Sequence, residues 1–301
     1  MKKVIIHEVG MRDGLQVERE VVPTETKIKW INELISTGMD IIQIGSFVHP
    51  VKVPQMADTD LIFKHFSESE SKPVNVILSG LVLNEKGLER GMNCGVEMFC
   101  MGASASETHS KKNTGMSTNE AVIRIINMAK NAMSENKKIQ VSVQSAFGCG
   151  YEGKIPKEKV INIISKYLEA DIKNISLADT AGHAYPEQVE DIIESVLKLS
   201  DNINIACHFH DTYGLGIANC HIAFKCGVGY FESAVAGLGG CPFTAKASGN
   251  VCTEDLVHMF NRMGFRKDVD LKKLNSVSKS VEEFFGREMP GKVYRMGTID
   301  Y

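Results

Sequence analysis

The sequence predicts a (β/α)8 TIM barrel followed by an additional helical segment at the C-terminus. Short runs rich in β-branched residues alternate with longer amphipathic runs along the 301 residues, as in a parallel sheet built from strand–helix units. Eight such units fit before about residue 262, which is the number that closes a barrel. An open doubly wound sheet is the alternative, but no G-x-G-x-x-G motif follows the first strand-like run.

The expected elements can be placed in order along the chain. The strand-like runs cover residues 3–10, 40–46, 73–80, 96–100, 139–147, 174–179, 203–211 and 230–237. The segments between them carry apolar residues at i, i+3 and i+4, as in TETKIKWINELISTG and PEQVEDIIESVLKLS, and are expected to be helices. Gly38, Gly91 and Gly227 are expected to end helices, because glycine adopts the left-handed cap without a steric penalty.

We expect one catalytic domain over residues 1–301. The barrel is expected at about 3–262, and a helix with a tail at about 268–301. No linker, low-complexity tract or block of like charges marks a second domain.

The composition is typical of a soluble globular protein. Hydrophobic residues make up 43% of the chain and charged residues 24%, so the chain can bury a sizeable core. The net charge of −3 argues against general binding to nucleic acids or anionic membranes. We expect no signal peptide or membrane span, because no apolar run is long enough. The eight cysteines are scattered without a CxxC pair, so we expect reduced thiols in a cytoplasmic protein.

Polar residues collect where the expected strands end, and the active sites of barrels lie at the carboxyl ends of the strands. These residues are Arg12, Asp13, Gln43, Ser46, Gln144, Ser145, Asp179, Thr180, His208, His210 and Asp211. The glycine-rich segment GLGGCPFTAKASGN follows the eighth strand. The barrel is expected to gather these clusters around one mouth.

His208 and His210 stand two residues apart in the seventh expected strand, so both imidazoles point to the same face. A single core histidine is usually structural, whereas a pair at this spacing favours a metal site. Asp13 adds a carboxylate at the mouth, and Asn250 adds an amide oxygen. Imidazoles combined with oxygen donors suit Mg²⁺, Mn²⁺, Co²⁺ or Zn²⁺, with coordination positions left for a substrate.

Arg12 and Cys241 are the other two candidate catalytic residues. Arg12 stands beside Asp13, and a fixed cation there suits an enolate or carbonyl oxygen. Cys241 follows several glycines near the mouth of the eighth strand. The residues alone leave two interpretations of this thiol: a small buried hydrophobe, or a group that exchanges a proton over the site.

Several motifs together resemble those of the 3-hydroxy-3-methylglutaryl-CoA lyase family. They are EVGMRDGLQ, SFVHPVKVPQMAD, ISLADTAG, HFHDTYGLGIAN and AVAGLGGCPFTAKASGNVCTEDLV, and the likeness runs from about residue 4 to 285. The family belongs to a superfamily of metal-dependent (β/α)8 lyases and Claisen-type synthases. The synthases lack the GLGGCP cysteine loop, so this loop favours a lyase.

The resemblance implies a role for each matching position. Four residues match the metal ligands of the family: Asp13, His208, His210 and Asn250. Arg12 matches the arginine that stabilises the enolate, and Cys241 matches a cysteine that takes part in proton transfer. Asp179 and Thr180 match a polar pair at the sixth strand.

The resemblance further implies cleavage of a 3-hydroxyacyl-CoA that carries a distal carboxylate, giving acetyl-CoA and a keto acid. His208 and Asp13 are both candidates for the general base. Leucine degradation is the implied metabolic setting. A homodimer is compatible with the family, and the expected extra helix at 271–285 offers a surface for it.

The sequence departs from the family pattern in the expected substrate pocket. Gln43 stands where the lyases carry a glutamate, and Ser145 replaces a cysteine. Gln140 and Ser142 stand where an arginine and a tyrosine are usual. We therefore expect Arg12, Gln43, Ser145, Asp179 and Thr180 to bind a substrate with an altered acyl group, such as citramalyl-CoA or a longer 3-substituted glutaryl-CoA. A Claisen-type condensing synthase and an inactive CoA-binding paralogue are the competing interpretations.

Overall fold

Eight parallel strands close into a barrel in the computed structural model, which describes residues 4–68, 74–240 and 249–299. The strands are β1 (Ile5–Glu8), β2 (Ile41–Ser46), β3 (Ile77–Leu81), β4 (Met98–Ser104), β5 (Lys138–Gln144), β6 (Asn174–Ala178), β7 (Asn204–His208) and β8 (Tyr230–Ser233). Each strand pairs with its neighbours in sequence, and β8 pairs with β1. The predicted (β/α)8 barrel is therefore confirmed.

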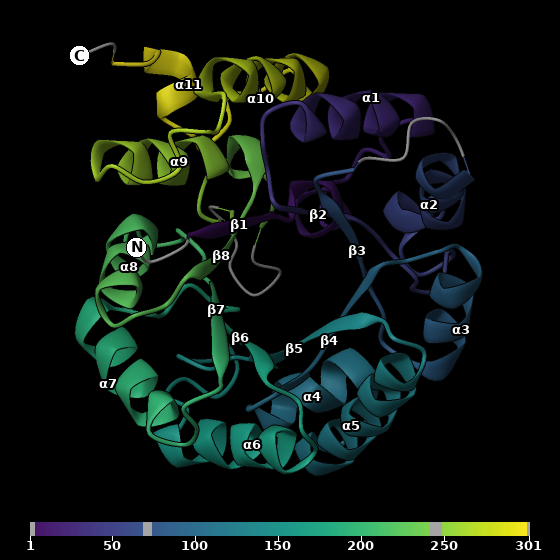
Figure 1. Ribbon diagram of the computed structural model, residues 1–301, viewed down its shortest axis with the longest axis vertical. Coiled ribbons are helices and arrows are strands. Elements are labelled where there is room, and N and C mark those ends of the chain that lie inside the picture. Colours follow the sequence, from purple (N-terminus) through teal and green to yellow (C-terminus); the bar gives the residue numbers. More distant parts are fainter. Residues whose placement is uncertain (1–3, 69–73, 241–248, 300–301) are drawn as a thin grey trace.

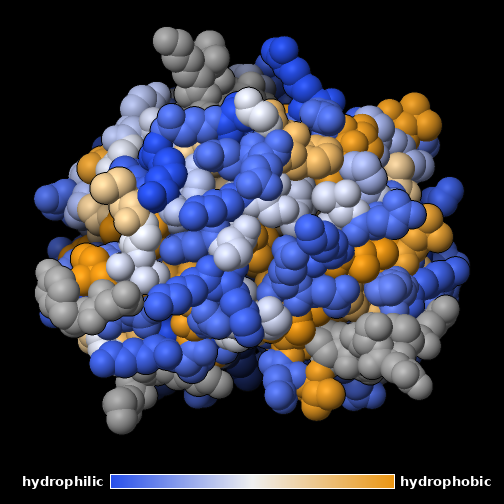
Figure 2. Space-filling view, turned by 90° about the horizontal axis from the view of Figure 1, so that it is seen from above, coloured by the Kyte–Doolittle hydropathy of each residue, from blue (hydrophilic) through white to orange (hydrophobic). Residues whose placement is uncertain are grey.

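Helices surround the barrel on its outside (Figure 1). They are α1 (Thr24–Ile35), α2 (Thr59–Glu68), α3 (Glu85–Asn93), α4 (Glu107–Thr114), α5 (Thr118–Ser134), α6 (Lys157–Glu169), α7 (Pro186–Leu197), α8 (Gly216–Lys225) and α9 (Thr253–Arg262). Within the described part of the chain, none of the helices combines the length and the apolar character that crossing a membrane requires. The face drawn in Figure 2 is mainly hydrophilic, with apolar side chains scattered over it.

The expected C-terminal segment consists of α10 (Leu271–Phe285) and the short α11 (Val293–Met296). Helix α10 packs beside α1 (Figure 1). The indole N–H of Trp30 donates to Ser280 Oγ at 3.0 Å, and the Trp30 ring meets the Phe284 ring edge-on at 5.5 Å. This contact attaches the added helix to the barrel's outer layer.

Strands β7 and β8 are among those that end earlier than the sequence predicted. Strand β7 ends at His208, and His210 is held beyond it by an isolated bridge to Asn250. Strand β8 ends at Ser233 and is followed by a 3-10 turn, η3 (Val235–Gly237), in which Ala236 has φ +59°. Both departures occur where the chain leaves the barrel to build the mouth.

The expectation that Gly91 ends a helix was wrong, because Gly91 lies inside α3. It is buried, and a Cβ atom there would lie only 2.5 Å from Cε1 of Phe99 in β4. Close approach of helix and strand, rather than a left-handed backbone, therefore accounts for this glycine. Gly38 and Gly227, by contrast, do have positive φ after α1 and α8.

Replacing Gly91 with alanine is expected to lower the free energy of unfolding by about 1–3 kcal/mol, because it overpacks the contact with Phe99. Urea denaturation measures this change. Glu89→Ala, at an exposed position of the same helix, is the matched control and should change the value by less than about 0.5 kcal/mol. An unchanged stability of G91A would show that Phe99 relaxes without cost.

The interior of the barrel changes from apolar to polar towards its mouth. Five side chains near the amino ends of the strands form an apolar cluster: Ile5, Ile41, Ile77, Met98 and Tyr230. Two residues further along these strands, on the same face, the side chains are His7, Gln43, Ser79, Cys100 and Glu232. Apolar residues thus close one end of the barrel, and a buried polar layer lies under the other.

Candidate active site

Arg12 and Asp13 lie in a single π-helical turn, η1 (Gly10–Gly14), directly after β1. The backbone N–H of Asp13 donates to Val9 O at 2.7 Å, which holds the turn against the end of the strand. The Arg12 guanidinium pairs with the Asp13 carboxylate through Nη1 and donates through Nε to Gln43 Oε1. The cation therefore has a fixed direction at the barrel mouth.

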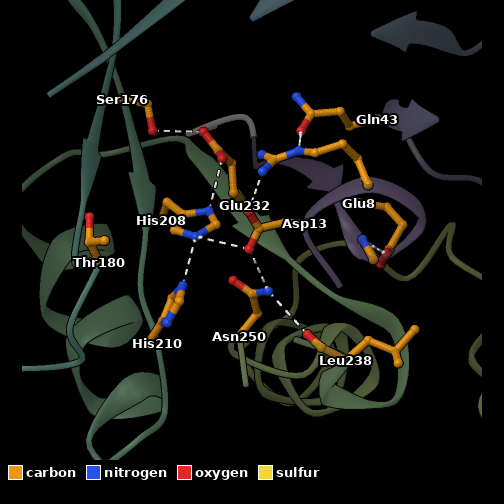
Figure 3. A network of polar contacts seen from close by, with 12 residues as sticks. Glu8, Asp13, Gln43, Ser176, Thr180, His208, His210, Glu232, Leu238 and Asn250 are labelled. Atoms are coloured by element: carbon orange, nitrogen blue, oxygen red, sulfur yellow. Dashed lines mark hydrogen bonds and ion pairs between the residues drawn. The ribbon is translucent and has the colours of Figure 1, made fainter. Parts of the chain in front are cut away.

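Asp13, His208 and His210 form one cluster, with a ligand atom from each within 4.8 Å of the others (Figure 3). His208 Nε2 lies 3.1 Å from His210 Nε2 and 3.8 Å from Asp13 Oδ2. Asn250 reaches the same place, because its Nδ2 donates to Asp13 Oδ2 at 3.0 Å. The tertiary structure thus brings together all four predicted metal ligands.

The donor set of this cluster fits a divalent cation. Two imidazole nitrogens face each other at 3.1 Å beside a carboxylate, which is a suitable combination for Mg²⁺, Mn²⁺ or Zn²⁺. Asn250 Oδ1 is buried and unpaired among the described residues. Its Nδ2 also donates to Leu238 O at 3.1 Å, so turning the amide oxygen towards Asp13 to bind a cation would give up the hydrogen bonds to both Asp13 and Leu238.

The charges of the cluster also suit a cation. Burial alone would raise the pKa of Asp13, but Arg12 and the two histidines outweigh it and hold this pKa well below its usual range. Burial lowers the pKa of His210 to about 4, so this imidazole is neutral at pH 7 and keeps a lone pair. An ionised carboxylate and a neutral imidazole are the forms that bind metals.

A cavity of about 230 Å³ opens beside the cluster. Of the predicted substrate contacts, Arg12, Gln43 and Thr180 line it. Strand β5 contributes three neutral polar side chains to its wall, Gln140, Ser142 and Gln144, and the apolar lining includes Leu81, Leu83 and Met101. The cavity therefore joins the metal-ligand cluster to a mixed polar and apolar pocket.

Ser145 and Asp179 are not among the residues that line this cavity. Ser145 has φ +55°, and its backbone N–H donates to Thr180 Oγ1 at 2.9 Å. Asp179 is fully buried and accepts from the backbone N–H groups of residues 183 and 184, while burial raises its pKa to about 7. Ser145 Oγ accepts from Ser104 Oγ at 3.4 Å, so both side chains support the loops around the mouth instead of facing the cavity.

Cys241 lies outside the described residues. The lining of the cavity extends along the chain as far as Gly240. The part assigned to this thiol therefore stays a prediction.

Glu232 is the residue of the site that the sequence reasoning missed. It is 6% exposed, and Oε2 accepts a hydrogen bond from His208 Nδ1 at 2.9 Å. Burial by itself raises the pKa of Glu232, but the adjacent His208 outweighs burial and lowers it. The signal was a charged residue at an inward-facing position of a buried strand, YFES. Cys100 and His109 also line the cavity.

Comparisons with known proteins agree with this geometry. The chain matches the family model described as HMGL-like over residues 3–281. It is 40% identical over 291 residues to hydroxymethylglutaryl-CoA lyase YngG of Bacillus subtilis, covering 97% of this chain and 96% of the relative. It is 38% identical over 292 residues to the mitochondrial hydroxymethylglutaryl-CoA lyase of Homo sapiens, covering 97% of this chain and 89% of the relative.

Solved structures give the same result. The crystal structure of the Bacillus subtilis HMG-CoA lyase superimposes with a TM-score of 0.93 at 39% identity, covering 98% of both chains. An HMG-CoA lyase from Acinetobacter baumannii, solved in complex with coenzyme A and 3-methylmalate, gives a TM-score of 0.91 at 35% identity. That comparison covers 99% of this chain and 96% of the other.

Proposed function

Because the chain belongs to the HMGL-like family, we propose that it is a divalent-metal-dependent carbon–carbon lyase acting on 3-hydroxy-3-methylglutaryl-CoA or a closely related thioester. The products are acetyl-CoA and a keto acid. The cluster of Asp13, His208 and His210 beside Arg12 is the observation that supports this proposal most directly. The printed names of relatives that align with nearly the whole chain support the substrate class.

Four residues would hold the cation: Asp13, His208, His210 and Asn250. When bound, a divalent cation supplies Lewis-acid charge that lowers the pKa of the substrate's 3-hydroxyl group. Mg²⁺ and Mn²⁺ are the proposed ions, with Zn²⁺ and Co²⁺ as alternatives, because the donors combine oxygen and imidazole nitrogen.

Side chains of the site are assigned the remaining steps, which are proton transfer and stabilisation of the enolate. Asp13 accepts the hydroxyl proton in this scheme, because His208 donates from Nδ1 to Glu232 and directs Nε2 at the cation site, which leaves it no free nitrogen. The carbon–carbon bond then breaks to leave an enolate of acetyl-CoA. Arg12 stabilises the enolate oxygen, since its guanidinium is held in one direction by Asp13 and Gln43 and has further N–H groups to donate. Cys241 is the proposed proton donor to the enolate carbon, on the strength of the resemblance.

A second candidate is a lyase for citramalyl-CoA or a longer 3-substituted glutaryl-CoA. The composition of the cavity wall favours it. Gln43 is neutral and already accepts from Arg12, so it adds no negative charge beside the substrate. Strand β5 contributes the neutral side chains Gln140 and Ser142 where the family usually carries an arginine and a tyrosine, so an acyl group of different charge or shape suits this wall.

We also propose that the enzyme works in the cytoplasm. The seven cysteines in the described part of the chain are all free, which suits a reducing compartment. An acyl-CoA is the expected partner, in keeping with the coenzyme A held by the Acinetobacter relative.

Chelation is expected to abolish acetyl-CoA release, and added Mg²⁺ or Mn²⁺ should restore it. The experiment incubates the purified protein with 3-hydroxy-3-methylglutaryl-CoA, and separately with citramalyl-CoA, before and after EDTA treatment. We expect EDTA to reduce the rate by about 10²-fold or more, because the ion contributes several kcal/mol of charge stabilisation. The thermal unfolding curve of the EDTA-treated protein serves as the control for loss of fold. Absence of metal-dependent cleavage with every thioester would contradict the proposed function.

A further inference from the structure

Glu232 lies in the middle of the polar network under the candidate metal site. It belongs to β8, and the strand register places it directly beside His208 of β7. Its side chain is almost completely buried, in the layer that separates the apolar end of the barrel from the cavity. A buried carboxylate is costly unless it is paired and hydrogen-bonded, so its partners indicate what it does there.

Both oxygens of the Glu232 carboxylate are engaged by side chains of three different strands, and Figure 3 shows the contacts with His208 and Ser176. Oε2 accepts from Nδ1 of His208 in β7 at 2.9 Å. Oε1 accepts from Ser176 Oγ of β6 at 2.7 Å and from Gln140 Nε2 of β5. The carboxylate is therefore clamped, and any rotation of it would break at least one buried hydrogen bond.

This clamp determines which nitrogen of His208 faces the cluster. Because Nδ1 donates to Glu232, Nε2 is the nitrogen directed at Asp13 Oδ2 and His210 Nε2. His210 differs, since its buried Nδ1 has no hydrogen-bond partner within the described residues. Among the described residues, a carboxylate anchors the imidazole of His208 but not that of His210.

We propose that Glu232 is a positioning residue: it orients the His208 imidazole so that Nε2 binds the divalent cation. Ser176 and Gln140 support this role by holding the carboxylate in place. The catalytic consequence rests on the proposed function, whereas the effect on metal affinity does not. A carboxylate behind a metal-binding histidine fixes the ring and raises its basicity, and its loss typically weakens metal binding 10- to 100-fold.

The proposal predicts that Glu232→Gln binds Mn²⁺ about 10- to 100-fold more weakly than the wild-type protein. The measurement is isothermal titration of the full-length, metal-free protein with Mn²⁺ alone. Titration with Co²⁺ adds the visible absorption spectrum, whose bands change when a ligand is reoriented. Glu254→Gln is the matched control, because Glu254 is also fully buried but accepts from Ala236 N and contacts none of the four candidate ligands. It should bind Mn²⁺ within about twofold of wild type.

A second variant tests the same proposal if E232Q does not fold. Ser176→Ala removes one clamp and leaves the contact between Glu232 and His208, so Mn²⁺ affinity should fall by about 2- to 10-fold, the worth of one hydrogen bond. The proposal is overturned if the folded variants bind Mn²⁺ as tightly as wild type, or if E254Q loses as much affinity as E232Q. A wild-type protein that binds Mn²⁺ but cleaves no thioester would refute the proposed function and leave this inference standing.

Discussion

Asp13→Asn is expected to lower kcat/KM for thioester cleavage by about 10³-fold or more, which corresponds to roughly 4 kcal/mol of transition-state stabilisation. The substitution removes the negative charge that pairs with Arg12 and faces both histidines. Breaking a buried pair by removing one partner leaves an uncompensated charge, here the Arg12 guanidinium. Steady-state kinetics with added Mn²⁺, together with a direct Mn²⁺ titration, measures the loss.

The matched control for this variant is Asp191→Asn. Asp191 is an aspartate in an exposed ion pair with Lys157 on the outside of the barrel, and it is expected to leave kcat/KM unchanged. If D13N kept more than about a tenth of the wild-type activity, Asp13 would not be a ligand of a catalytic ion.

Arg12→Gln is expected to lower kcat by about 10²- to 10³-fold, the usual cost of removing one group that stabilises a developing oxyanion. The neutral amide would leave Asp13, His208 and His210 in place, so Mn²⁺ affinity should change far less than in D13N. Arg12→Lys restores the charge without the planar fork that bonds both Gln43 and Asp13, and should recover only part of kcat. Rapid-quench single-turnover assays separate this effect on chemistry from product release.

Arg124→Gln is the corresponding surface control. Arg124 pairs with Glu85 at an exposed position and is not among the described residues that line the cavity. A kcat that falls equally in R124Q and R12Q, or a loss in R12Q confined to KM, would contradict the assigned role of Arg12 in enolate stabilisation.

The fold could be predicted from the sequence, because a closed parallel barrel is encoded locally. Each strand–helix unit carries its own periodicity, and eight of them in succession specify the architecture without knowledge of any long-range contact. The shared direction of the two histidine side chains could also be predicted, since residues two apart on a strand point to the same face. Asp13 could be placed with them because the carboxyl ends of all strands in such a barrel meet at one mouth.

Which polar residues face the cavity and which support its walls depends on the three-dimensional packing of the loops. Asp179 and Ser145 stand at strand ends like Thr180, yet the backbone of their loops turns them towards backbone N–H groups and neighbouring hydroxyls. Glu232 was overlooked because its partners lie 24, 56 and 92 residues away along the chain. Side-chain hydrogen bonds across neighbouring and more distant strands depend on the register and direction of the whole barrel, and local sequence patterns do not carry that information.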